Sequence, residues 1–125
     1  MKKHLPIILI SLISLPIFSQ TWTPQINPTT AVNTGVYFTN DNTGYVCGDN
    51  GELAKTTNGG TTWTSLSSGV TTHLSYIHFS NDTTGYIVGA LGASTTAIKT
   101  TNGGSSWSPM STGVSQTIVF VGQMN

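Results

Sequence analysis

The chain has 125 residues, enough for one small domain, and only 6% of them are charged. Gly, Ser, Thr and Asn are abundant and Arg is absent, which favours short strands joined by turns and argues against a helical bundle. Apart from two lysines at the start, only Lys55 and Lys99 oppose the four acidic residues. No basic patch is therefore expected, and nucleic acid is not a predicted partner.

Residues 1–19 are predicted to be a signal peptide. Two lysines near the start precede a run rich in Leu and Ile, which ends at Phe18 and is too short to span a bilayer comfortably. Polar sequence follows, and cleavage is expected between Ser19 and Gln20. The mature chain is thus predicted to be secreted or extracytoplasmic (periplasm, cell surface or extracellular) without a membrane span. A retained membrane anchor is the alternative.

Two similar units follow, at residues 34–66 and 75–110. In the first, strands are expected over 36–38, 45–47, 52–56 and 62–66. The second repeats the pattern over 77–79, 86–89, 98–100 and around Trp107. The offset between units grows from 41 residues at the start to 44 at the end, so three extra residues are expected to lengthen the turn within 90–97.

Each unit ends in one eight-residue motif, Thr-Thr-Asn-Gly-Gly-Thr-Thr-Trp at 56–63 and Thr-Thr-Asn-Gly-Gly-Ser-Ser-Trp at 100–107. Gly enters positive φ without steric cost and Asn can bond the nearby backbone, so the motif predicts a hairpin bend and its return strand. The Trp offers a large apolar body for packing. We expect a structural role for the motif positions, which are Thr56, Asn58, Gly60, Thr62, Trp63, Thr100, Asn102, Gly104, Ser106 and Trp107.

The motif resembles the Asp-box, or bacterial neuraminidase repeat, with Asn in the Asp position. The wider unit, Phe-x-Asn-Asp-x-Thr-Gly-Tyr followed by the box, is similar to the repeat of the photosystem II assembly and stability factor family. That family builds seven-bladed β-propellers, so the resemblance implies a propeller and a protein client or surface ligand. It also implies that residues 21–23 form the outer strand of a preceding or closing blade, because Trp22 precedes Phe38 by the 16 residues that separate Trp63 from Phe79.

The predicted fold is all-β: a partial β-propeller with two complete four-stranded antiparallel blades within 20–125. A repeat of about 40 residues is the period of a propeller blade. Continuous apolar runs in the second strands imply that both sheet faces are covered. A two-sheet sandwich is the alternative. Residues 117–125 match the start of a third blade, which predicts a fragment of a longer exported protein. A small protein that closes its ring by oligomerising is the other possibility.

Little in the sequence points to a cofactor or metal. Cys47 has Val88 as its counterpart, which indicates a small buried apolar position, although an unpaired Cys in an exported protein is also a candidate reactive thiol. No Cys and His cluster has zinc-ligand spacing. His78 replaces Tyr37 of the first unit and is expected to pack or lie at the surface, near His73.

The sequence favours a non-catalytic binding scaffold. Asp-box repeats also occur in sialidases, which hold their substrate with an Arg cluster that is absent here. Similar glycosidases that cleave xyloglucan need two carboxylates, for which Asp41 and Asp82 are candidates by type. Their equivalent places in two turns favour a turn-forming role, and Asp49 and Glu52 also flank a turn. We therefore expect no catalytic residue. The alternative is the repeat portion of a secreted glycoside hydrolase, sialidase-like or xyloglucanase-like, whose catalytic residues lie outside this chain.

Overall fold

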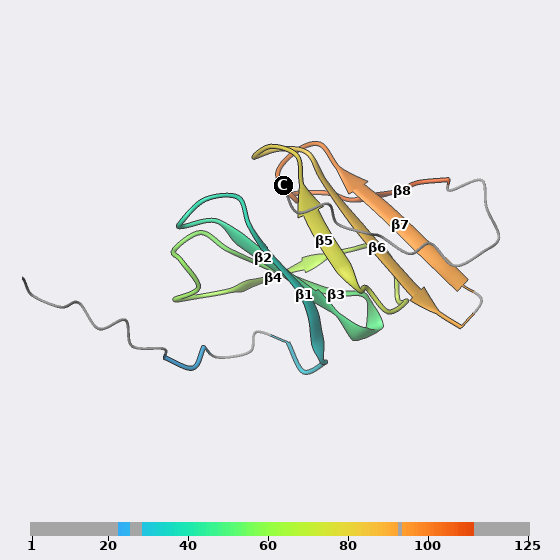
Figure 1. Ribbon diagram of the computed structural model, residues 1–125, viewed down its shortest axis with the longest axis horizontal. Coiled ribbons are helices and arrows are strands. Elements are labelled where there is room, and N and C mark those ends of the chain that lie inside the picture. The colour runs from blue at the N-terminus through green and yellow to red at the C-terminus, as the bar shows by residue number, and fades with distance from the viewer. Residues whose placement is uncertain (1–22, 26–28, 93, 112–125) are drawn as a thin grey trace, which may run out of the picture.

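The computed structural model describes residues 23–25, 29–92 and 94–111, which form two four-stranded antiparallel sheets (Figure 1). Each sheet is a meander in which consecutive strands pair, as in a propeller blade. Blade 1 consists of β1 (Asn33–Phe38), β2 (Gly44–Gly48), β3 (Glu52–Thr56) and β4 (Thr64–Ser67), with the short 3-10 turn η1 (Asp49–Gly51) before β3. Blade 2 consists of β5 (Tyr76–Phe79), β6 (Gly85–Leu91), β7 (Ser94–Thr100) and β8 (Ser108–Pro109). The prediction of an all-β partial propeller is confirmed.

The two blades pack face to face, with the first strands, β1 and β5, side by side (Figure 1). One face of each sheet is apolar because alternate residues of a strand point to the same side. The two apolar faces meet in a single core. Its buried members are Tyr45, Cys47, Leu53, Leu74, Ile77, Phe79, Ile87, Ile98 and Trp107.

Polar contacts join the blades as well. The Tyr45 hydroxyl and the Lys55 ammonium both donate to the carbonyl oxygen of Gly103, at 2.8 and 2.9 Å. The Tyr37 hydroxyl donates to the carbonyl of Phe79 at 2.9 Å. The Tyr45 ring stacks on that of Phe79, with ring centroids 4.3 Å apart. The contact between blades therefore combines aromatic stacking with hydrogen bonds to backbone carbonyls.

The box turns, which we define as residues 56–63 and 100–107, are closed by their own side chains. The Asn58 carboxamide oxygen accepts the Thr62 N–H at 2.9 Å, and the Thr56 hydroxyl oxygen accepts the Gly60 N–H at 2.9 Å. Gly59 and Gly60 both have positive φ, at 66° and 88°, where a side chain would be strained. The second box turn repeats these bonds and dihedral angles, through Thr100, Asn102, Gly103, Gly104 and Ser106.

Each box turn is also tied to the turn between the first two strands of its own blade. The Gly59 N–H donates to the Asn42 carbonyl at 2.9 Å, and the Gly103 N–H donates to the Thr83 carbonyl at 2.8 Å. The first-strand turns are themselves held by Asn40 and Asn81, whose side-chain oxygens each accept two backbone N–H groups. The two turns at one end of a blade therefore form a single hydrogen-bonded unit.

The three extra residues of the second unit lengthen the paired strands of a hairpin and not the turn between them. Strands β6 and β7 have seven residues each and remain paired out to Leu91 and Ser94, with Gly92 at the turn. The prediction of a longer turn was wrong, because Thr95 and Thr96 are β-branched and favour continued pairing. Blade 1 instead bends at η1, where Asn50 has a positive φ of 59°. Strand β4 also begins two residues later than predicted, because the Thr62 N–H belongs to the box turn.

Coverage of the sheet faces differs between the blades. Strand β2 is buried at all five positions, as its continuous apolar run predicted. In β6, Tyr86 and Val88 on the outward face are only half-buried, while Ile87 on the inward face is buried. The outer faces also leave Val36 63% and Phe38 42% exposed in blade 1. Among the described residues, the outward faces are thus less completely covered than the faces that meet between the blades.

Several predictions concern residues outside the described part. The signal peptide with its cleavage site, the outer strand at 21–23 with Trp22, and the start of a third blade at 117–125 lie wholly or largely there. Within residues 23–25, 29–92 and 94–111, no helix is long and apolar enough to cross a membrane.

Candidate binding site

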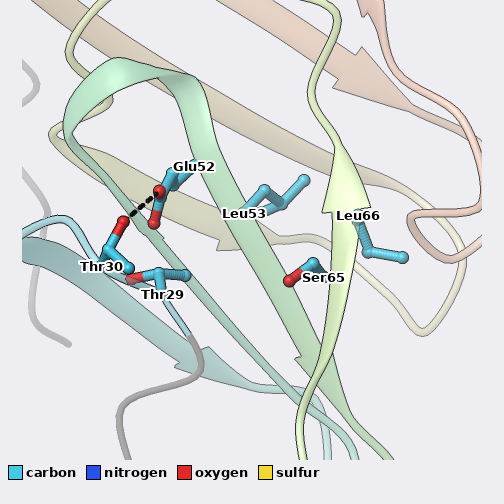
Figure 2. Close-up of a pocket in the computed structure, with 6 residues that line it drawn as sticks. All are labelled: Thr29, Thr30, Glu52, Leu53, Ser65 and Leu66. Carbon is cyan, nitrogen blue, oxygen red and sulfur yellow. Dashed lines mark hydrogen bonds between the residues drawn. The ribbon is translucent and has the colours of Figure 1, made fainter.

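The largest of three notable hollows, about 270 Å³, lies on blade 1 (Figure 2). Thr29, Thr30 and Glu52 form its polar side, and the remaining lining comes from strands β3 and β4. The Glu52 carboxylate accepts the Thr30 hydroxyl at 3.4 Å and the Ala31 N–H at 3.3 Å. Glu52 therefore ties the segment before β1 to the start of β3, and this explains its presence without a ligand.

The apolar side of the same hollow is made by Leu53 and Leu66, which face each other across β3 and β4. Leu53 is buried and belongs to the core between the blades, and Leu66 packs against that core. Only Ser65 adds a further polar group. The hollow is consequently the outer margin of the packed core, next to a carboxylate that is already hydrogen-bonded.

A second hollow of about 180 Å³ lies where the two blades meet, and we call it the junction hollow. It is lined by the ends of β1 and β5, the innermost strands, and by the residues just after them. These are Tyr37 and Thr39 from blade 1, and Phe79, Ser80, Asn81 and Asp82 from blade 2. The walls are aromatic, because the Tyr37 and Phe79 rings stack with centroids 5.9 Å apart. The polar groups are three hydroxyls, an amide and a carboxylate.

The junction hollow has groups that remain available to a ligand. The Asn81 side-chain oxygen is used in its own turn, where it accepts the N–H groups of Thr83 and Thr84. Asp82 is exposed, and no basic group of the described residues forms a salt bridge with it. An aromatic wall beside an unneutralised carboxylate suits a basic or amide-bearing side chain.

The third hollow, about 250 Å³, lies at the opposite end of the strands and is lined by Asp49, Asn50, Thr71 and His73. His73 Nδ1 is hydrogen-bonded to the Asp49 carboxylate. This bond connects η1 of blade 1 to the segment that leads into blade 2. Both side chains thus serve the connection between blades, a role that the sequence had not indicated for His73.

The residues considered as catalytic or reactive candidates, Asp41, Asp82 and Cys47, have structural surroundings. Asp41 and Asp82 lie in equivalent turns of different blades, where their neighbours' backbone groups bind the box turns. Within the described residues, no group of three or more His, Cys, Asp or Glu side chains is placed to hold a metal ion. Cys47 is buried, as predicted, and burial raises the pKa of its thiol to about 12, although a hydrogen bond from the Gly35 backbone acts in the opposite direction.

His78, predicted to pack or lie at the surface, contacts the Tyr37 ring edge-on, with ring centroids 5.1 Å apart. It therefore supports the aromatic wall of the junction hollow from outside. The sequence did not single out Tyr37, Thr39 or Ser80 as site residues. Their only sequence signal is position: each lies in, or directly after, the first strand of a unit.

Comparison with protein families identifies the repeat. Residues 16–117 match the family described as Photosynthesis system II assembly factor YCF48. The chain belongs to this family. The resemblance inferred from the box motif and the preceding turn is thereby confirmed. No curated protein matches the chain.

Two solved structures are similar to the chain. One, described as YCF48 bound to D1 peptide, is 30% identical with a TM-score of 0.57, and the match covers 67% of this chain and 28% of that one. Another, YCF48 from Cyanidioschyzon merolae, is 24% identical with a TM-score of 0.58, covering 68% and 28%, and supports the fold alone. The match thus spans less than a third of the length of these two proteins.

Proposed function

We propose that this chain is a non-catalytic β-propeller module that binds an extended segment of another protein at the junction hollow. The observation that carries the proposal is the pairing of stacked aromatic walls with the unneutralised Asp82 carboxylate, at the ends of the two innermost strands. Strand ends are where rigid scaffolds commonly present binding residues.

The family supports a protein ligand. A related YCF48 structure is described as bound to D1 peptide. The chemistry of the hollow in this chain favours a peptide with a basic side chain, because Asp82 is its one charged group.

We also propose that the module works outside the cytoplasm, at the cell surface, in the periplasm or in the medium. The basic start, the apolar run to Phe18 and the small residue Ser19 support export. Mass spectrometry of the protein secreted by an expressing cell tests this point. A mature N-terminus at Gln20 is expected, whereas retention of Met1 in the folded product would contradict export with cleavage.

Binding is tested with a panel of short fluorescent peptides that differ only in one central residue, Lys, Glu or Ala. Fluorescence anisotropy should show the tightest binding for Lys. Asp82→Asn should weaken binding of the Lys peptides about fivefold and leave the Ala peptides unchanged, because an exposed ion pair contributes about 1 kcal/mol or less.

The matched control is Asp41→Asn, which changes the equivalent carboxylate of blade 1, a residue that does not line the junction hollow. It should leave all affinities unchanged. Equal losses in the two variants, or no peptide bound above background, would overturn the proposed site.

A further inference from the structure

Asn followed by Gly occurs three times in the chain, at residues 50–51, 58–59 and 102–103. This is the dipeptide in which an asparagine most readily loses its side-chain amide, because a Gly has no side chain to hinder its own nitrogen from attacking the carboxamide carbon. All three asparagines are exposed to water. Exposure therefore does not distinguish them, and the local hydrogen bonds decide which one can react.

The asparagine of the first box turn is held at each of its reacting groups. The Asn58 carboxamide oxygen accepts the Thr56 hydroxyl and the Thr62 N–H, at 3.0 and 2.9 Å, and its NH₂ group donates to the Thr62 hydroxyl at 2.9 Å. The Gly59 nitrogen, which would be the attacking atom, donates its N–H to the Asn42 carbonyl at 2.9 Å. Ring closure would have to break these bonds together.

The second box turn holds its asparagine in the same way. The Asn102 carboxamide makes three bonds of 2.9 Å, to the Thr100 hydroxyl and to the N–H and hydroxyl of Ser106. Gly103 is buried, and its N–H donates to the Thr83 carbonyl at 2.8 Å. The hydrogen bonds that close a box turn therefore also keep its asparagine from reacting.

Asn50, in the turn η1, lacks these restraints. Within the described part of the chain, no group is hydrogen-bonded to its carboxamide. Asn50 and Gly51 have positive φ, at 59° and 72°, as at the centre of a type I′ turn. The turn is closed by the Glu52 N–H, which donates to the Asp49 carbonyl. The Asn50 side chain can thus rotate on a turn that other groups keep in place.

Ring closure at Asn50 requires a flip of the peptide between Asn50 and Gly51. At the present ψ of 22°, the Gly51 nitrogen points away from the Asn50 side chain. The flip gives a type II′ turn, in which ψ at the first central residue is about −120° and that nitrogen lies beside the side chain. Gly51 accepts either sign of φ, and its carbonyl can keep the Ser68 hydroxyl at 2.6 Å because only the preceding peptide moves.

We propose that Asn50 is a site of spontaneous deamidation, from which the box turns protect Asn58 and Asn102. The Gly51 nitrogen bonds to Asn50 Cγ, the Cγ–Nδ2 bond breaks, and ammonia leaves with the proton of the Gly51 nitrogen. Water then opens the five-membered imide and returns a proton to that nitrogen. Attack at Cγ yields aspartate, and attack at the backbone carbonyl carbon yields isoaspartate. One water is consumed and one ammonia is released, with no oxidant or reductant.

The product changes the end of the blades where His73 binds Asp49. Asn50 lines the hollow of about 250 Å³ there, so deamidation adds a second carboxylate beside the one that His73 already contacts. Isoaspartate also lengthens the main chain by one carbon within a two-residue turn, which should disturb the pairing of β2 with β3. The proposal does not depend on peptide binding, because the junction hollow lies at the other end of the strands.

The test is peptide mapping by mass spectrometry of the full chain, sampled during incubation in warm, mildly alkaline buffer. Asn50 should lose its amide at least about tenfold faster than Asn58 or Asn102, because the box turns must first give up more than one hydrogen bond. Fragmentation that separates aspartate from isoaspartate should find both at position 50. In concentrated urea the three sites should react at comparable rates, since they share one dipeptide.

Two variants test the cause of the difference. Thr62→Ala removes the hydroxyl to which the Asn58 NH₂ group donates, and should speed deamidation of Asn58 about fivefold without changing Asn102. Ser106→Ala makes the matched change for Asn102, and serves if Thr62→Ala does not fold by circular dichroism. Asn50→Gly, which suits the positive φ, should abolish most of the ammonia that the folded chain releases.

Three outcomes would overturn the proposal. The first is an Asn50 that stays intact in the folded chain while it reacts in urea. The second is a folded chain in which Asn58 or Asn102 reacts as fast as Asn50. The third is a pair of alanine variants that fold and leave the rates at Asn58 and Asn102 unchanged.

Discussion

The contact at Gly103 makes a prediction about how the two blades hold together. Tyr45→Phe removes the hydroxyl and keeps the ring, which stacks on Phe79 at 4.3 Å. The Gly103 carbonyl keeps its second donor, Lys55, so this variant should cost only the net value of one buried hydrogen bond, about 1 kcal/mol. Lys55→Met, which keeps much of the aliphatic stem, should likewise cost about 1 kcal/mol.

The double variant is expected to cost more than the sum. With both donors gone, the Gly103 carbonyl is left without either side-chain partner at a junction where Tyr45 is fully buried. An unsatisfied buried acceptor costs about 1–3 kcal/mol, so the double variant should lose about 3–4 kcal/mol, with a coupling of about 1 kcal/mol or more. The coupling arises because the two donors share one acceptor.

Urea unfolding followed by tryptophan fluorescence measures these differences, at a concentration low enough to avoid association. The matched controls are Tyr86→Phe and Lys99→Met, which make the same chemical changes in blade 2, where the described residues place no acceptor against either group. Each should change the free energy of unfolding by less than about 0.5 kcal/mol. The reasoning is refuted if the blade 1 pair is additive, or if the blade 2 controls cost as much.

Three further predictions follow from the turns and the thiol. Asn102→Ala should lower the free energy of unfolding by about 2 kcal/mol, because the Asn102 side chain makes several hydrogen bonds within its box turn. Asn102→Asp keeps the acceptor oxygen and should cost far less in the same urea assay. Gly104→Ala should lower the free energy of unfolding by at least about 1 kcal/mol more than Gly60→Ala does. Both glycines have positive φ, but only at Gly104 would an added Cβ lie 2.8 Å from the Tyr45 ring. Equal losses in the two variants would contradict the role of this close approach. The Cys47 thiol ionises near pH 9 in the unfolded chain and near 12 in the folded one, so the unfolded chain loses its proton first. Stability should therefore fall by about 1 kcal/mol between pH 9 and 10 relative to Cys47→Ala, whereas parallel pH profiles would show that this residue contributes nothing.

The sequence predicted the blades because their signals are local and occur twice. The two box turns are closed by bonds between residues at most four positions apart, so Asn58 and Asn102 could be read directly as turn residues. The longer β6–β7 hairpin was missed for a related reason. An insertion shows only as extra length, and whether it extends strands or a turn depends on pairing between Leu91 and Ser94 that no spacing reveals.

The candidate site could not be predicted in the same way. Asp41 and Asp82 occupy equivalent turns, yet only Asp82 lines the junction hollow, because only the blade 2 turn has the end of β1 beside it. The hydrogen bond to the Gly103 carbonyl also could not be predicted from the sequence, because its donor, Tyr45, lies 58 residues away. Tyr86 has the same local sequence features as Tyr45 but has no such partner among residues 29–92 and 94–111.

The difference between the blades shows that the burial of a side chain here depends on its contact with a neighbouring blade and not on the residue type. Phe38 and Phe79 follow from the same sequence pattern and meet equivalent tryptophans at nearly the same angle, but one is 42% exposed and the other 3%. In repeat proteins of this kind, stability is approximately a sum of the units and of the interfaces between neighbours. A blade of this chain should therefore gain most from a neighbour that supplies a Tyr and Lys pair in register. Because the donors act on a backbone carbonyl, that neighbour is recognised through the shape of the box turn rather than through a particular side chain.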